Sequence, residues 1–197
     1  MPAPDRTNLP AIVVAARAIL ERKGAAGLTM QAVAEQVGVR APSLYKRVEG
    51  RDELVGLVVE ATLRELGERL GEVQDATAGQ PEAQALPALA RAFREFAHTY
   101  PAGHAMAFGP LPPASRPAHD VLVASVAPVL RATTALVGDA HALDAARTVT
   151  AWANGFLAME LSGAFQLGGD VTSAFDYGVT LLVDALGRRH PTEEPES

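Results

Sequence analysis

The sequence predicts an all-α protein in which a small N-terminal helical domain precedes a larger helical domain. Apolar residues recur at intervals of three and four along most of the 197 residues, and no stretch alternates apolar with polar residues as a half-buried strand does. Glycine and proline divide these stretches into about nine helices. Hydrophobic residues make up 48% of the chain and charged residues 20%, which is the balance of a folded domain with a buried core.

Three helices are predicted within the first 50 residues. Asn8 caps the first helix, Gly24 stops it, and its apolar stripe consists of Leu9, Ile12, Val13, Ala16, Ile19 and Leu20. Thr29 caps a short second helix whose inward residues are Val33, Ala34 and Val37. Gly38 then supplies a tight turn, and Pro42 opens a third helix, where its missing N–H costs nothing.

A longer helix is predicted to begin at Arg51, with a buried face of Leu54, Leu57, Val58, Ala61 and Leu66. Residues 73–81 are polar and contain glycine and proline, which predicts a connection. The next helix ends at Tyr100-Pro101, and its apolar face consists of Leu86, Leu89, Ala90, Phe93, Phe96 and Ala97.

The remaining elements follow from proline and periodicity. A short helix over 102–108 precedes a loop over 109–117, where four prolines forbid regular helix. Three long helices are then predicted, over 118–137, 142–166 and 171–188. These boundaries give a small helical domain over 1–50, a larger helical domain over 51–189 and a disordered tail over 190–197.

Charge is distributed unevenly along the chain. The net charge is -6, but residues 1–60 hold eight Lys/Arg and seven Asp/Glu (+1), whereas residues 61–197 hold nine and sixteen (-7). Within the first part, Arg40, Lys46, Arg47 and Arg51 fall inside twelve residues. Local basic density of this kind suits contact with phosphates, although a solvated helix end has the same composition.

The segment from Thr29 to Arg47, TMQAVAEQVGVRAPSLYKR, has the construction of a helix-turn-helix. Small Ala34 permits close helix contact, Gly38 allows the turn, and the residues that hold the angle between the helices are Val37, Val39 and Leu44. The side chains left outward are Arg40, Ser43, Tyr45 and Lys46, all of which suit base edges or phosphates.

With these residues in view, the N-terminal part resembles the TetR family of transcriptional regulators across residues 9–66, most closely in LTMQAVAEQVGVRAPSLYKRVEGRDEL. The resemblance implies that Thr29 contacts phosphate and that bases or the groove wall face Arg40, Ala41, Pro42 and Ser43. It further implies backbone contacts from Tyr45, Lys46 and Arg51. Val48 stands where the family commonly has an aromatic residue, so packing beneath the recognition helix is expected to differ slightly.

Two C-terminal stretches, YPAGHAMAF and WANGFLAMEL, resemble one subgroup of the same family through Trp152, Gly155 and Phe156. The resemblance implies a homodimer formed by the last two long helices and a small-molecule effector held among the others. The expected interface stripes are Ala145, Thr148, Val149, Trp152, Phe156 and Met159, followed by Val171, Phe175, Val179, Leu182, Val183 and Leu186. From spacing alone the same stripes are as compatible with an ordinary core.

The candidates for an apolar effector pocket with a few polar handles are Phe93, Phe96, His98, Met106, Phe108, Trp152, Phe156 and Met159. Each of them taken singly fits a core position as well. Asn154 either orients a ligand or caps a kink.

The function expected from these patterns is that of a repressor that binds a palindromic operator in double-stranded DNA as a homodimer. A small, largely apolar effector would shift the helix carrying Arg51 and release the DNA.

An enzyme is not expected, because the chain lacks cysteine and the GxSxG, GxGxxG and P-loop motifs. No cofactor or metal is expected, since His98 and His104 lack ligand spacing. A helical module that binds protein would need the basic helix to be coincidental. No signal peptide or long apolar run is evident, which predicts a cytoplasmic protein without membrane contact.

Overall fold

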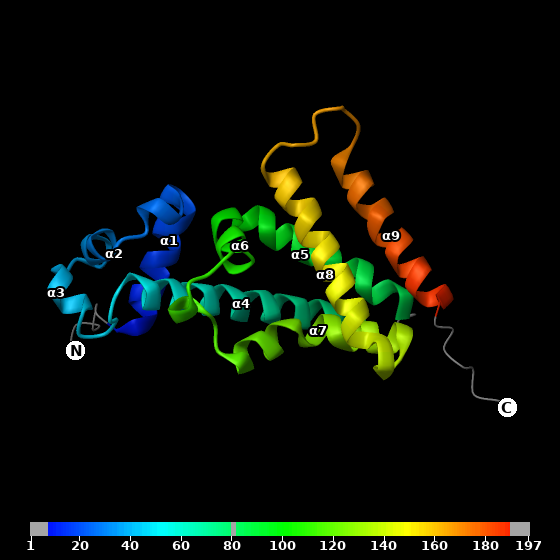
Figure 1. Cartoon of the computed structure of the whole chain (residues 1–197), viewed down its shortest axis with the longest axis horizontal. Helices are drawn as coiled ribbons and strands as arrows, with labels where there is room; N and C mark the ends of the chain where they lie inside the picture. The colour runs from blue at the N-terminus through cyan, green and yellow to red at the C-terminus, as the bar shows by residue number, and fades with distance from the viewer. Residues whose placement is uncertain (1–7, 80–81, 190–197) are drawn as a thin grey trace. The chain divides into compact units, whose positions relative to one another are not determined.

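The computed structural model describes residues 8–79 and 82–189, so the prediction of a disordered tail over 190–197 lies outside the described residues. Within those ranges the chain is helical and contains no strand, which confirms the all-α prediction (Figure 1). The elements in order are α1 (Leu9–Gly27), α2 (Met30–Val37), α3 (Ala41–Leu44), α4 (Arg51–Ala76), α5 (Glu82–Thr99), α6 (Pro101–Ala107), the 3₁₀ turn η1 (Pro113–Ser115), α7 (His119–Val137), α8 (Asp139–Leu161) and α9 (Val171–Arg189).

The helices group into two compact units. The N-terminal unit combines residues 1–65 with 100–122, and the C-terminal unit combines 66–99 with 123–197. This division differs from the boundary at residue 50 that the sequence predicts. The difference has a physical cause: Glu21 of α1 accepts backbone hydrogen bonds from Ala102 and Gly103 of α6, at 3.1 and 2.7 Å. Contacts between distant segments therefore bind α6 and the loop after it to the N-terminal helices.

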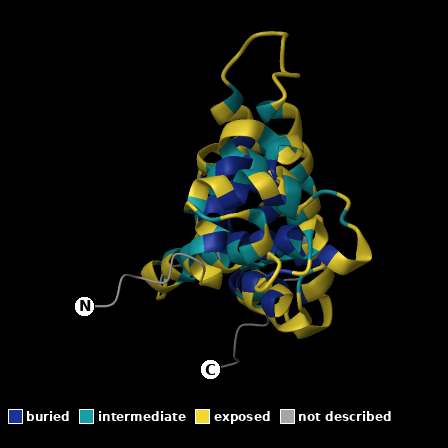
Figure 2. Ribbon diagram, turned by 90° about the vertical axis from the view of Figure 1, so that its left-hand side faces the viewer, coloured by how far each residue is buried: buried dark blue, intermediate teal, exposed yellow. Residues whose placement is uncertain are grey.

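The core of the N-terminal unit forms where α1, α2, α3 and the first half of α4 turn their apolar residues toward each other. Ile12, Ala16, Ile19 and Leu20 of the predicted α1 stripe are buried as expected. Leu9 is exposed, contrary to the prediction, because it begins the helix at the end of the stripe. Figure 2 colours the buried residues dark blue and the exposed ones yellow.

Local signals set the helix ends in this unit. Asn8 and Thr29 act as the N-caps that the sequence predicts, accepting from the backbone N–H of Ala11 at 2.9 Å and of Ala32 at 3.1 Å. Gly24 breaks the helical geometry of α1 with φ 67° and ψ -177°, and one further turn follows as far as Gly27. The predicted stop is therefore a kink rather than an end.

The C-terminal unit buries the apolar stripe of α5 completely, since Leu86, Leu89, Ala90, Phe93, Phe96 and Ala97 are all buried. Two predicted boundaries are wrong. The connection expected from residue 73 begins later, because the polar residues before Ala76 continue α4. The helix expected to reach 166 ends at Leu161, because Gly163 adopts φ 69° and the N–H of Ala164 closes on the carbonyl of Met159 at 2.9 Å.

Helices α8 and α9 form an adjacent pair joined by an exposed loop (Figures 1 and 2). Five of the twelve residues expected to form a dimer interface are buried in the chain itself, namely Ala145, Val149, Phe175, Val179 and Val183. The interface stays a prediction. The aromatic members pair within the chain, which explains why this face turns inward. The exposed apolar residues of the pair are Leu143 and Met159 on α8 and Tyr177 and Leu181 on α9, and of these Met159 belongs to the predicted stripes.

Among the described residues, α7 is the one helix with the length and composition of a membrane span, with a mean hydropathy of 1.5 over its most apolar window. It buries Val121, Ala132 and Leu136 inside the protein. Core helices of globular proteins commonly have this composition.

Candidate nucleic-acid interface

The turn between α2 and α3 is held by backbone hydrogen bonds around Gly38. Gly38 adopts the left-handed conformation with φ 77°, and its N–H donates to the carbonyl of Glu35 at 3.2 Å. The N–H of Val39 reaches back to the carbonyl of Ala34 at 2.9 Å, which completes a Schellman-type end for α2. A side chain at position 38 would strain this geometry, so glycine is the residue that allows the turn.

Two buried side chains fix α3 against the rest of the unit. Leu44 is fully buried, and Val48, just after the helix, is 1% exposed. The sequence predicts altered packing at Val48, and the structure shows that valine at this position is still shielded from solvent. Pro42 lies in the first turn of α3, as expected, where no backbone donor is needed.

The opposite side of this segment is exposed and basic. Arg40, Pro42, Tyr45, Lys46 and Arg47 are exposed, whereas Ala41 and Ser43 are partly buried. No Asp or Glu occurs from Gln36 to Val48, a segment that holds Arg40, Lys46 and Arg47. Among the described residues, neither Arg40 nor Lys46 forms an ion pair. Cations without carboxylate partners are available for phosphates and base edges.

Thr29 and Arg51, two further predicted DNA contacts, also have structural tasks. The hydroxyl of Thr29 is exposed while it caps α2, so a second bond to a phosphate is compatible with the cap. Arg51 donates from Nε to the carbonyl of Leu28 at 3.1 Å and from Nη2 to the carbonyl of Ala25 at 3.0 Å. Its guanidinium thereby joins the start of α4 to the end of α1, a role that the sequence analysis did not predict.

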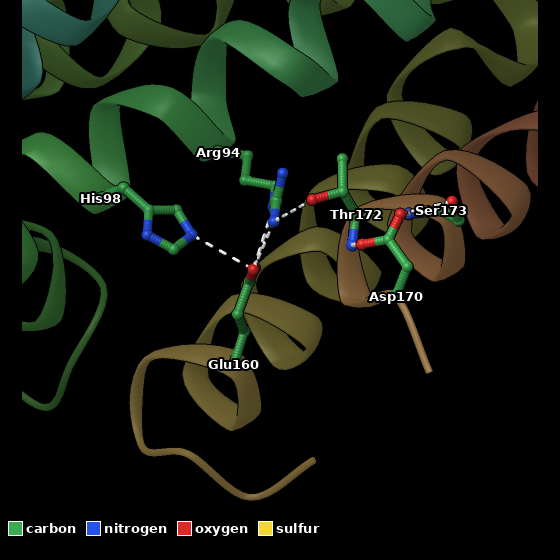
Figure 3. A network of polar contacts seen from close by, with 6 residues as sticks. All are labelled: Arg94, His98, Glu160, Asp170, Thr172 and Ser173. Atoms are coloured by element: carbon green, nitrogen blue, oxygen red, sulfur yellow. Dashed lines mark hydrogen bonds and ion pairs between the residues drawn. The ribbon is translucent and has the colours of Figure 1, made fainter. Parts of the chain in front are cut away.

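A polar network connects α5, α8 and α9 in the C-terminal unit (Figure 3). Arg94 donates to Glu160 at 2.9 Å from Nε and at 2.5 Å from Nη2, and to the hydroxyl of Thr172 at 3.1 Å. The Nε2 of His98 lies 3.3 Å from the same carboxylate. Hydrogen bonding from Arg94 lowers the pKa of Glu160, and Glu160 in turn raises the pKa of Arg94. Sequence patterns could not reveal a pair 66 residues apart.

Two of the predicted effector residues, Trp152 and Phe156, belong to an aromatic cluster with Phe165 and Phe175. The ring centroids of neighbouring members lie 4.8–5.6 Å apart. Trp152 packs over Gly178 so closely that a Cβ there would come within 2.2 Å of the indole. Glycine at 178 therefore makes the space for the tryptophan.

The other effector candidates are distributed over both units. Phe93 and Phe96 are buried in the core, Met159 is exposed, and the ring of Phe108 lies 4.9 Å from that of His104. His98 lines a cavity of about 410 Å³ together with Arg91, Arg94, Glu95, Thr172 and Asp176. Met106 lines a different cavity, of about 400 Å³, in the N-terminal unit. A single pocket formed by all eight residues stays a prediction.

Asn154 has a partly satisfied side chain. Its amide nitrogen donates to the carbonyl of Thr150 at 3.2 Å, one turn earlier in α8. Its Oδ1 is buried and has no hydrogen-bond partner among the described residues. This bond is the kind that a polar residue makes to its own helix. The two roles expected from the sequence, orienting a ligand or capping a kink, stay predictions.

Two models of known protein families match this chain, one in its N-terminal part and one in its C-terminal part. The model of bacterial regulatory proteins of the tetR family matches residues 12–58, and that of the tetracyclin repressor-like C-terminal domain matches residues 86–182. The HTH-type transcriptional regulator Rv1816 of Mycobacterium tuberculosis is 34% identical over 102 residues, which are 51% of this chain and 44% of the relative. The matched region thus spans less than half the length of that curated relative.

Solved structures match over nearly the whole chain. BioQ of Mycobacterium smegmatis is 30% identical with a TM-score of 0.68, and the match covers 92% of this chain and 98% of that one. BioQ with its double-stranded DNA operator is 28% identical with a TM-score of 0.63, over 90% of this chain and 96% of that one. The turn at Gly38, the exposed basic α3 and these matches together identify the chain as a member of the TetR family of DNA-binding, helix-turn-helix transcriptional regulators.

Proposed function

We propose that the protein is a repressor that binds a palindromic DNA operator as a homodimer and is released by a small, largely apolar effector. The observation that carries the proposal is the exposed surface of α3, where Arg40, Tyr45 and Lys46 project beside a buried Leu44. A helix fixed on one side and basic on the other is suited to lie in a major groove. Solved structures include BioQ with its operator, and the same mode is proposed here.

The predicted DNA contacts divide into two kinds. Arg40 is proposed to read a base edge, together with Ala41, Pro42 and Ser43 against the groove wall. Thr29, Tyr45, Lys46 and Arg51 are proposed to hold the phosphate backbone, which positions the helix without reading sequence. Contacts of the second kind release counterions and make affinity depend on salt.

The homodimer is supported by apolar residues that α8 and α9 leave exposed. Leu143, Met159, Tyr177 and Leu181 are between 47 and 67% exposed, and Leu181 lies one turn after Tyr177 on α9. Apolar side chains exposed on two adjacent helices mark an interaction surface. A twofold axis through this face would pack two helices from each protomer into a four-helix arrangement.

Effector release is proposed to act through α4. This helix begins at Arg51, which holds the end of α1, so a displacement of α4 moves the helix-turn-helix. The two recognition helices of a dimer must fit sites about one DNA turn apart, and a changed separation lowers affinity. The proposal involves no catalysis, cofactor or membrane, and places the protein in the cytoplasm with its operator.

The decisive experiment is footprinting of the protein on the DNA that flanks its own gene, followed by titration of the protected fragment at several salt concentrations. We expect a palindromic footprint and an affinity that falls steeply with salt, because several phosphates are contacted per protomer. Binding that is absent, or that does not change with salt, would contradict the proposal.

A further inference from the structure

The cavity lined by Met106 lies within the N-terminal unit, close to the helix-turn-helix. Its volume is about 400 Å³, within the range of small-molecule sites. The wall consists of Ala25, Arg51, Val55, Ala102, Ala105, Met106, Gly109, Pro110, Leu111 and Pro112. Nine of these ten residues are apolar, and Arg51 is the one charged residue among them.

Hydrogen bonds hold this wall in place at two points. Glu21 binds the backbone N–H groups of Ala102 and Gly103, and a Cβ at Gly103 would lie 3.0 Å from that carboxylate. Buried Ser115 donates to the carbonyl of Asp52 at 2.8 Å, which attaches the proline-rich loop to α4. These bonds fix α6 to α1 and the proline-rich loop to α4, so the wall of this open cavity is held by hydrogen bonds.

The guanidinium of Arg51 has donors to spare. Arginine has five N–H groups, and the structure uses one on Nε and one on Nη2 for the two backbone carbonyls. Within the described residues no carboxylate forms an ion pair with Arg51, whose hydrogen bonds go to the two backbone carbonyls. A guanidinium in this state favours a carboxylate, to which it binds with charge-assisted hydrogen bonds.

We propose that this cavity binds a small amphipathic monocarboxylate, with its carboxylate on Arg51 and its apolar tail against Val55, Met106 and Leu111. A single cation in an apolar wall matches a single negative charge, whereas a ligand with several charges would leave some of them unpaired. The site is separate from the effector candidates of the C-terminal unit.

The position of Arg51 connects such a ligand to DNA binding, a connection that rests on the proposed function. Arg51 holds the carbonyls of Ala25 and Leu28, and the next residue, Thr29, caps α2. A carboxylate that takes up the remaining N–H groups competes with a DNA phosphate for the same cation. The ligand and the operator would then weaken each other's binding.

The test uses the full chain without DNA, so that failure of the site and failure of the proposed function are distinguishable. Protein with ¹³C-methyl methionine is titrated with octanoate and with octan-1-ol while NMR signals are followed. Met106 reports on the cavity, whereas Met30 lies in α2 and Met159 in α8. We expect a saturable shift of the Met106 signal alone, and octanoate affinity about tenfold above that of octan-1-ol because of the charged hydrogen bond.

Variants locate the site. Ala105→Phe fills the cavity from α6 and is expected to weaken octanoate binding about tenfold or more through lost space. The matched control Ala135→Phe, at an exposed alanine of α7 outside the wall, leaves binding unchanged. Ala25→Phe fills the cavity from α1 and gives the same test if Ala105→Phe does not fold. Arg51→Gln should lower octanoate affinity to that of octan-1-ol.

Three results would overturn the proposal. They are a shift of Met159 without Met106, equal binding of octanoate and octan-1-ol by the wild type, and wild-type octanoate affinity in both folded cavity-filling variants.

Discussion

The helix-turn-helix and the α8–α9 pair are both built from adjacent helices, yet they differ in how far local sequence determines them. In the helix-turn-helix, each side of α3 has one character: Leu44 is buried, and Arg40 and Lys46 are exposed. In α8 and α9 both sides are apolar, because Phe175 is buried while Tyr177 and Leu181 are exposed. Periodicity identifies the buried side of a helix only when the opposite side is polar.

Shortening the buried side chain of α3 should have the largest effect on stability. Leu44→Ala removes a fully buried side chain and is expected to lower the free energy of unfolding by about 2–5 kcal/mol. Chemical denaturation measures the loss, with Val14→Ala as the control because Val14 is exposed on α1. Equal effects of the two changes would mean that α3 is not held by its buried side.

Charge on the outward side of α8 and α9 should weaken the dimer. The double variant Leu143→Lys, Leu181→Lys is expected to raise the dimer dissociation constant about 100-fold, or about 2.7 kcal/mol, because buried lysines lack partners. Sedimentation equilibrium measures the change, and Val14→Lys serves as the control at an exposed valine of α1. An unchanged dimer would exclude this face.

The inward side of the same pair is tested at Gly178. Gly178→Ala forces a methyl group against the indole of Trp152 and should lower the free energy of unfolding by about 2 kcal/mol. The matched control is Gly71→Ala in α4, where a Cβ meets nothing within 4 Å. There the change should raise stability by about 0.5–1 kcal/mol. Thermal unfolding of both variants distinguishes tight packing from open space.

The network between α5 and α8 predicts a dependence on pH. Because Arg94 lowers the pKa of Glu160, the carboxylate stabilises the fold above its ordinary pKa of 4.5, and this contribution disappears as pH falls through the lowered value. In the Arg94→Met variant, the free energy of unfolding that is lost on acidification because of Glu160 should be smaller by about 1 kcal/mol. Denaturation from pH 6 downward measures it. Glu68→Gln, at an exposed position of α4, should retain the wild-type profile.

The smallest stability effect is expected at Thr29. Thr29→Asp retains an N-cap for α2, so the free energy of unfolding should change by less than about 0.5 kcal/mol. The same carboxylate repels a phosphate, so DNA affinity should fall at least about tenfold. Thr29→Ser is the control that retains both functions. Unchanged DNA affinity in Thr29→Asp would assign Thr29 to the cap alone.

Caps and turns could be predicted from the sequence, whereas contacts between distant residues could not. Asn8, Thr29, Gly38 and Pro42 were predictable because a cap or turn depends on a few adjacent residues. The partners of Arg51 were not, because they lie 23 and 26 residues away and are backbone carbonyls, which every residue type supplies.

The same limit applies to helix ends and to the core. The end of α4 was missed because polar residues continue an exposed helix as readily as they form a loop. The inward side of α8 was missed because its aromatic residues fit either an interface or a core, and only their packing against Phe175 and Gly178 decides. The DNA and effector residues remain predictions, and Thr29→Asp tests one of the DNA contacts.

The bonds from Arg51 to Ala25 and Leu28 also set where the polypeptide can be divided. A fragment that stops at residue 50 contains all of α1, α2 and α3 but lacks the guanidinium that satisfies two carbonyls at the end of α1. Transfer of the DNA-reading helices to another protein would therefore have to include the first turn of α4. In this chain the portable module extends at least one residue beyond its visible motif.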